Sequence, residues 1–203
     1  PAPAPVPPGG GGGGTGSGGG PGTAACPAWV LAAASGASPS SCRAYGEPEA
    51  VSVEVLSRQA RGAVVELRTG GFYAVSDAAG LVRAFVPGMD DAGEPSAPAL
   101  PVKRTLVDAV VGRSARLVSV RELDRRAFPG LRPAALGEPE LVAPGDGTLR
   151  PSRRAARLSP TGGRFVPADA ALLAGSAFQG EEKSAVLDLA PLRYDAARDR
   201  LVL

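Results

Sequence analysis

The sequence predicts an all-β chain: an antiparallel β-sandwich with one short helix and a disordered N-terminal tail. Short valine- and leucine-containing runs alternate apolar and polar residues, and glycine, proline and aspartate separate these runs. Helical periodicity is rare along the chain. Several strands of similar length with little helix are typical of two packed antiparallel sheets.

The composition divides the chain into three parts. Residues 1–22, PAPAPVPPGGGGGGTGSGGGPG, offer almost no side chain that could be buried, which predicts a flexible tether. Residues 23–48 hold Cys26, Cys42 and the run WVLAAASGASPS, which predicts either a short helix or a loop closed by the cysteine pair. Residues 49–203 have the size of a single domain with its own core.

The predicted strands follow from a two-residue repeat. In AVSVEVLS, Val51, Val53 and Val55 alternate with Ser52 and Glu54, giving one apolar and one polar face. Further strands are predicted in GAVVELRT (62–69), FYAV (72–75), LVRAFVP (81–87), ARLVSVREL (115–123), SAVLDLAPLRYD (184–195) and DRLVL (199–203). Pro191 indicates an edge position or the end of a strand, because proline cannot donate a ladder hydrogen bond.

Two segments do not fit the strand pattern. PADAALLAGSAF (167–178) predicts the one short helix of the domain, with Asp169 as its cap and Gly175 at its end. The stretch from Phe128 to Arg164 has little pattern and is long for a loop, and such loops are usually functional or disordered.

The chain is predicted not to be an enzyme. It has no histidine, which is the commonest general base and metal ligand. Cys26 and Cys42 have no histidine to activate them as nucleophiles, and two cysteines are too few for a structural zinc site. We interpret them as one disulfide, with two free thiols as the alternative. A disulfide implies an oxidising compartment. No cofactor or metal is expected.

The charges argue against a nucleic-acid partner. Lysine and arginine total 22 and aspartate and glutamate total 20, for a net charge of +2. Arg153, Arg154 and Arg157 cluster, but no aromatic residue lies among them to stack on bases, so a solvated loop is expected. No apolar run reaches the ~20 residues that span a membrane. The chain begins with Pro1, so we expect a secreted or cell-surface protein whose signal peptide has been removed.

Adjacent carboxylates also fail to make a catalytic pair. Asp90 with Asp91, and Glu181 with Glu182, are neighbours, and neighbouring strand residues point to opposite faces. They are expected to be solvated turn charges. Asp90, Asp91 and Glu94 lack the alternating oxygen spacing of a calcium loop, so no metal is predicted there.

Four segments in order resemble the N-terminal propeptide of gingipain-type cysteine peptidases. Gly93-Glu94-Pro95 leads through Leu100-Pro101-Val102 into an apolar strand, a turn at Gly112 and a second strand, like the family's G-x-P-x-L-P-v segment. The strand pair before it, containing Val51 to Val55 and Val64 to Leu67, and the later run Phe178-Gln179-Gly180-Glu181-Glu182 are the second and third segments.

The fourth segment is LDLAPLRYDAARDRLVL, which resembles a family hairpin through Pro191, Tyr194, Asp195 and Leu201. The resemblance covers about Glu49 to Leu203. From the residues themselves, Tyr194 is expected to bury its ring and reach a backbone partner with its hydroxyl. Asp195 is expected to begin a turn, with solvated arginines nearby.

The resemblance implies a β-sandwich that covers the active site of its own peptidase, assists its folding and is cut away on activation. The chain would then be the non-catalytic, inhibitory part of a secreted zymogen. Its partner would be a cysteine peptidase domain, in cis or after cleavage, and the free domain is expected to be a monomer.

The sequence departs from the family at the inhibitory position. In arginine-specific members a basic residue a few positions before Phe-x-Gly enters the specificity pocket, but residues 174–177 here are Ala, Gly, Ser and Ala. Either the cognate peptidase is not arginine-specific or another residue blocks its cleft. The inhibitory-loop candidates are Arg154, Arg157, Arg164, Gly175, Ser176 and Phe178.

An alternative is a cell-surface or extracellular β-sandwich for binding, adhesion or assembly, without inhibitory action. One tryptophan, three tyrosines and five phenylalanines are few for both a core and an exposed carbohydrate platform. A structural module in a larger secreted protein fits the same residues.

Overall fold

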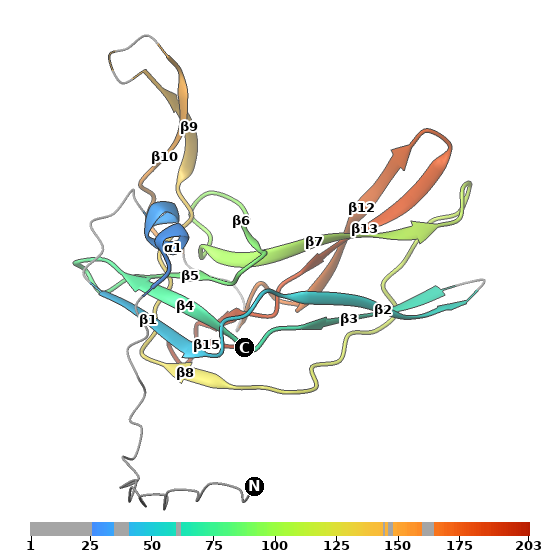
Figure 1. Ribbon diagram of the computed structural model, residues 1–203, viewed down its shortest axis with the longest axis horizontal. Helices are drawn as coiled ribbons and strands as arrows, with labels where there is room; N and C mark the ends of the chain where they lie inside the picture. Colours follow the sequence, from blue (N-terminus) through green and yellow to red (C-terminus); the bar gives the residue numbers. More distant parts are fainter. Residues whose placement is uncertain (1–25, 35–40, 60–61, 144, 146–147, 160–164) are drawn as a thin grey trace, which may run out of the picture.

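A computed structural model describes residues 26–34, 41–59, 62–143, 145, 148–159 and 165–203 (Figure 1). The predicted tether, residues 1–22, lies outside the described residues. In the described part every pairing between named strands is antiparallel, so the all-β antiparallel class with one short helix is confirmed. The elements are α1 (Ala28–Ala33), β1 (Ser41–Gly46), β2 (Ser52–Gln59), β3 (Gly62–Arg68), β4 (Gly71–Ser76), β5 (Val82–Phe85), β6 (Asp90–Ala92), β7 (Leu100–Ala109), β8 (Ala127–Pro129), β9 (Glu138–Val142), β10 (Arg150–Arg154), β11 (Phe165–Val166), β12 (Ala171–Gln179), β13 (Glu182–Leu189), β14 (Arg193–Asp195) and β15 (Arg200–Val202).

Two sheets share the main core. One has the strand order β1-β4-β5 and the other β11-β14-β15-β8. Phe72 of β4 is fully buried between them, stacked on Tyr45 at 5.1 Å and edge-on to Phe128 of β8 at 5.1 Å between ring centroids. The buried members of this core are Phe72, Ala74, Val82, Ala84, Val86, Leu100, Leu131, Leu192, Tyr194 and Leu201.

Helix α1 covers the outer face of the β1-β4-β5 sheet. Alternate β4 residues point outward, so Val75 packs with Val30, Ala34 and Phe85 in a second cluster. A disulfide joins Cys26, just before α1, to Cys42 of β1, with the two Cα atoms 6.1 Å apart. The described part of the segment expected as a linker, residues 23–48, therefore supplies a helix and a core strand.

The other strands form ribbons outside this core. Figure 1 shows the β9–β10 hairpin projecting on the side of α1, while β2–β3 and the β12-β13-β7-β6 sheet extend in another direction. The outer parts of these ribbons expose large apolar side chains, including Val55, Leu56, Val64, Leu106, Leu141, Leu149, Leu172 and Phe178. The apolar face that the alternation in 50–57 predicts is thus only partly buried.

The helix prediction for residues 167–178 is wrong. Most of this segment is strand β12, which pairs with β13 from Ala171↔Leu189 to Gln179↔Glu182. Alanine and leucine favour helices locally, but the ladder to β13 overrides that propensity. Gly175 does not end a helix; it has φ +154° and lies at a break in the β12 register. The one helix of the described residues lies instead in AWVLAA, within the first of the two interpretations given for residues 23–48.

The strand prediction for residues 115–123 is also wrong, because no strand of the described chain pairs with this segment. The predicted strands in 50–57, 62–69, 72–75, 81–87, 184–195 and 199–203 are all present. Pro191 lies between β13 and β14, so it marks a strand end. The patternless stretch 128–164 contains the β9–β10 hairpin.

Replacing Phe72 with alanine should destabilise the domain by about 3–5 kcal/mol, because the ring is fully enclosed by the two sheets. Phe178→Ala is the matched control, since that ring is 64% exposed and should change stability by less than about 0.5 kcal/mol. Urea unfolding followed by circular dichroism measures both. Equal losses in the two variants would contradict this core assignment.

Removing the disulfide in the double variant C26S/C42S should cost about 3 kcal/mol, because the bond closes a loop with a sequence separation of 16. Chemical denaturation of the variant and of the oxidised wild type measures the difference. The wild type in a reducing agent should match the variant. Identical unfolding midpoints for the oxidised and reduced wild type would contradict the prediction.

Candidate functional site

The structure separates the inhibitory-loop candidates into two groups. Arg154 ends β10 and Arg157 follows it, whereas Gly175, Ser176 and Phe178 lie on β12. Figure 1 shows these two strands in different projecting ribbons. Arg164 lies outside the described residues. The described candidates therefore do not form one loop.

The β12 candidates lie on an exposed edge strand. Ser176 and Phe178 are exposed, and a side chain added at Gly175 would meet no atom within 4 Å. Lys183 of β13 lies 5.8 Å from the centre of the Phe178 ring. Along its other edge, β12 pairs with no strand of the described chain, and its sequence ALLAGSAFQ contains no charged residue or proline. Such an edge lacks the charged residues and proline that often protect an edge strand from pairing with another chain.

The arginines of β10 are held by the hairpin itself. Arg154 pairs with Glu138 directly across the β9–β10 ladder. Arg153 donates a hydrogen bond to the Gly137 carbonyl at 3.0 Å. Arg157, beyond the strand, is exposed. The expected solvated loop at this arginine cluster is in part a strand. Two of the three arginines make contacts within the β9–β10 hairpin and its flanking residues, called the arm below.

The segment that contains the predicted strand 115–123 is an exposed connection between two strands. Residues 110–126, called the connector below, run from the end of β7 to β8 (Figure 1). The connector exposes six large aliphatic side chains, with Val118 at 79% and Leu123 at 76%, together with Val110, Val111, Leu117 and Val120. No backbone hydrogen bond ties residues 114–121 to the rest of the described chain.

The connector is fixed at both ends. At its start, Lys183 donates from Nζ to the Arg113 carbonyl at 2.6 Å. At its end, Arg126 exchanges two backbone hydrogen bonds with Leu203, at 2.7 and 2.9 Å. The alternating pattern of ARLVSVREL was the available signal, but the pattern could not reveal that this stretch lacks a strand partner.

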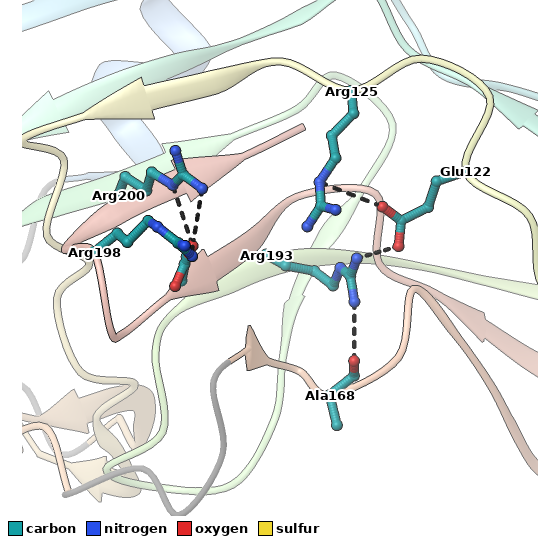
Figure 2. Close-up of polar contacts among 7 residues, drawn as sticks. Glu122, Arg125, Ala168, Arg193, Arg198 and Arg200 are labelled. Carbon is teal, nitrogen blue, oxygen red and sulfur yellow. Dashed lines mark hydrogen bonds and ion pairs between the residues drawn. The ribbon is translucent and has the colours of Figure 1, made fainter.

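A buried arginine joins the connector to the core. Arg193 of β14 is only 7% exposed; its guanidinium donates to the Ala168 carbonyl at 2.9 Å and to Glu122 of the connector (Figure 2). Its Cζ lies 4.7 Å from the centre of the Phe165 ring, and that of Arg125 lies 4.9 Å from the same ring. The expectation that the arginines near Tyr194 are solvated is therefore wrong for Arg193.

The β14–β15 turn contains a second buried charge. Asp195 is fully buried, and its carboxylate accepts hydrogen bonds from Arg200 Nε at 3.1 Å and Arg198 Nη1 at 3.3 Å (Figure 2). Tyr194 buries its ring as expected, but its hydroxyl donates to the Asp199 side chain at 2.6 Å and not to the backbone. Burial and, to a smaller extent, the hydrogen bond to Asp199 raise the pKa of Tyr194 to about 12.

Two carboxylates elsewhere act in ion pairs that the sequence did not predict. Arg104 of β7 binds Asp188 of β13 through two hydrogen bonds, at 2.7 and 2.8 Å, and this contact lowers the pKa of Asp188. Asp91 is not a solvated turn charge, because it lies in β6 and pairs with Arg83 at 2.7 Å. The described residues contain no cluster of three or more cysteines and carboxylates placed to hold a metal ion.

The fold is similar to that of a solved gingipain chain. A chain from a study of the zymogenic latency of gingipain K from Porphyromonas gingivalis matches with a TM-score of 0.57 and 15% identity, over 81% of this chain and 93% of that chain. This chain has a gingipain-type propeptide-like fold. A chain from the complex of the pro- and mature domains of RgpB from Porphyromonas gingivalis matches with a TM-score of 0.47 and 15% identity, over 74% and 77%.

The similarity is found in the structure and not over the sequence as a whole. No protein-family model matches the sequence, and no curated protein matches it. At 15% identity the likeness to the gingipain K chain concerns the fold. The described residues include no helix long and apolar enough to cross a membrane.

Raising the pH from 10 to 12 should destabilise this fold through Tyr194. The hydroxyl stays protonated to about pH 12 in the fold but ionises near pH 10 in the unfolded chain. Its contribution is therefore complete below pH 10 and is lost between pH 10 and 12, by up to about 2 kcal/mol. Denaturant unfolding of wild type and Tyr194→Phe across this range measures the difference. Parallel declines in both proteins would contradict it.

Proposed function

We propose that this chain is the non-catalytic propeptide domain of a secreted gingipain-type cysteine peptidase precursor, and that it assists the folding of the peptidase and inhibits it. The observation that carries the proposal is the connector: a long exposed segment without strand partners, fixed at both ends on a packed core. The propeptide-like fold supports the same conclusion.

The connector has the properties of a cleft-blocking segment. Extended peptides commonly bind by adding main-chain hydrogen bonds to a strand edge of the partner, with alternate side chains in pockets. Residues 114–121 make no backbone hydrogen bond to the rest of the described chain, and from Val118 to Arg121 apolar side chains alternate with polar ones. Fixed ends reduce the ordering entropy lost on binding. We therefore place the inhibitory contact on the connector, which also carries Arg113, Arg116 and Arg121.

The projecting ribbons supply the surface for folding assistance. β2–β3 pairs with no third strand of the described chain and exposes Val55, Leu56 and Val64. An isolated two-stranded ribbon is at best marginally stable, and soluble monomers rarely expose contiguous apolar patches. A peptidase domain that packs on these ribbons while it folds would bury their exposed apolar side chains against its own. Gly175, Ser176 and Phe178 belong to this surface in our proposal, and Arg154 and Arg157 to the separate arm.

The test is inhibition of the mature peptidase encoded in the same precursor. The purified domain should reduce turnover of peptidyl-arginine or peptidyl-lysine fluorogenic substrates with an inhibition constant of about 1 µM or tighter. Replacing Leu117, Val118 and Val120 of the connector with alanine should weaken inhibition by about ten- to a hundredfold, because these are the large apolar side chains within residues 114–121.

The matched control is the double variant L141A/L149A. Both leucines are also exposed, at 68% for Leu141 and 62% for Leu149, but they lie on and next to the β9–β10 hairpin and not on the connector. This variant should inhibit like the wild type. Unchanged turnover at high concentrations of wild-type domain would reject the inhibitory function. Equal weakening by both variants would reject the placement of the inhibitory contact.

A further inference from the structure

We propose that Glu122 and Arg193 form a latch that holds the connector in place, and that this latch determines how well the connector is presented to the peptidase. The holding role is a property of this chain alone. The presentation role rests on the function proposed above.

Arg193 provides the fixed half of the latch. It belongs to β14, the strand between β11 and β15, and its side chain is buried. Its guanidinium contacts three groups: it donates hydrogen bonds to the Glu122 carboxylate and the Ala168 carbonyl, and it lies over the Phe165 ring. Of these, only Glu122 carries a negative charge. A buried guanidinium that loses its carboxylate is strongly destabilised, so this contact favours the bound position of Glu122.

Glu122 provides the half that belongs to the connector. Its carboxylate binds Arg193, and Arg125 of the same segment lies 3.6 Å from it (Figure 2). Arg125 also lies over Phe165 of β11, at 4.9 Å from the ring centre. The latch thus brings one connector carboxylate and one connector arginine against the same two strands of the core.

The position of the latch along the chain sets the length of the connector that is left unattached. Arg113 is held through Lys183, and the next polar contact described is that of Glu122 with Arg193, so residues 114–121 span two fixed points. Without the latch, the following backbone attachment is Arg126 with Leu203. The unattached span would then lengthen, and a longer free loop loses more entropy when it is ordered on a partner.

The experiment compares Glu122→Gln with Asp124→Asn in the full chain by ¹⁵N NMR relaxation. Both variants remove one carboxylate from the same exposed segment, but only Glu122 contacts the core. In Glu122→Gln the backbone order parameters of residues 114–121 should fall below about 0.6, while Asp124→Asn should keep the wild-type values.

A second variant is needed if Glu122→Gln does not fold because the buried Arg193 guanidinium has lost its carboxylate. Arg193→Met removes the charge itself and keeps an apolar side chain of similar length, which buried sites often tolerate. It should mobilise the same residues with unchanged chemical shifts in β4 and β5. Wild-type order parameters in folded Arg193→Met or Glu122→Gln would overturn the latch.

Inhibition then tests the presentation role separately. If the wild type inhibits its peptidase, both latch variants should inhibit about tenfold more weakly, and Asp124→Asn should not. Wild-type inhibition by variants with a mobile connector would overturn this role. If the wild type does not inhibit at all, the proposed function fails while the relaxation result still decides the latch.

Discussion

The buried carboxylate of Asp195 is the constraint around which the described structure is arranged. A fully buried charge is tolerated only when cationic groups reach it, and here Arg198 and Arg200 do so from the turn and strand that follow. Holding both arginines requires the tight β14–β15 hairpin. That hairpin delivers Tyr194 and Leu201 to the main core and pairs with β11 on one side and β8 on the other.

The β14–β15 hairpin also carries the residues that attach the connector. Arg193 immediately precedes the Tyr194-Asp195 pair, so the register that buries Asp195 also positions the guanidinium that binds Glu122. Leu203, just after β15, binds the backbone of Arg126. Two attachments of the connector therefore depend on one short supersecondary unit, and the unattached residues 114–121 extend from it.

A division between a packed core and unpaired surroundings suits a protein that acts by binding. The core is small and shared by two sheets, while the ribbons and the connector display aliphatic side chains and free main-chain groups. Apolar exposure of this kind is costly in isolation and is repaid when a partner covers it. In the function we propose, folding assistance and inhibition use one physical property, because a surface that completes the partner's fold also blocks access to it.

The sequence by itself determined the strands whose two-residue alternation is local, such as Val51 to Val55, because burial on one face is written into neighbouring residues. It also favoured the Cys26–Cys42 bond and the position of Pro191 at a strand end. Tertiary structure decided the rest. Residues 171–179 favour a helix until β13 pairs with them, and residues 115–123 read as a strand although no strand meets them. The Glu122–Arg193 contact joins residues 71 positions apart, a distance at which no periodicity carries information.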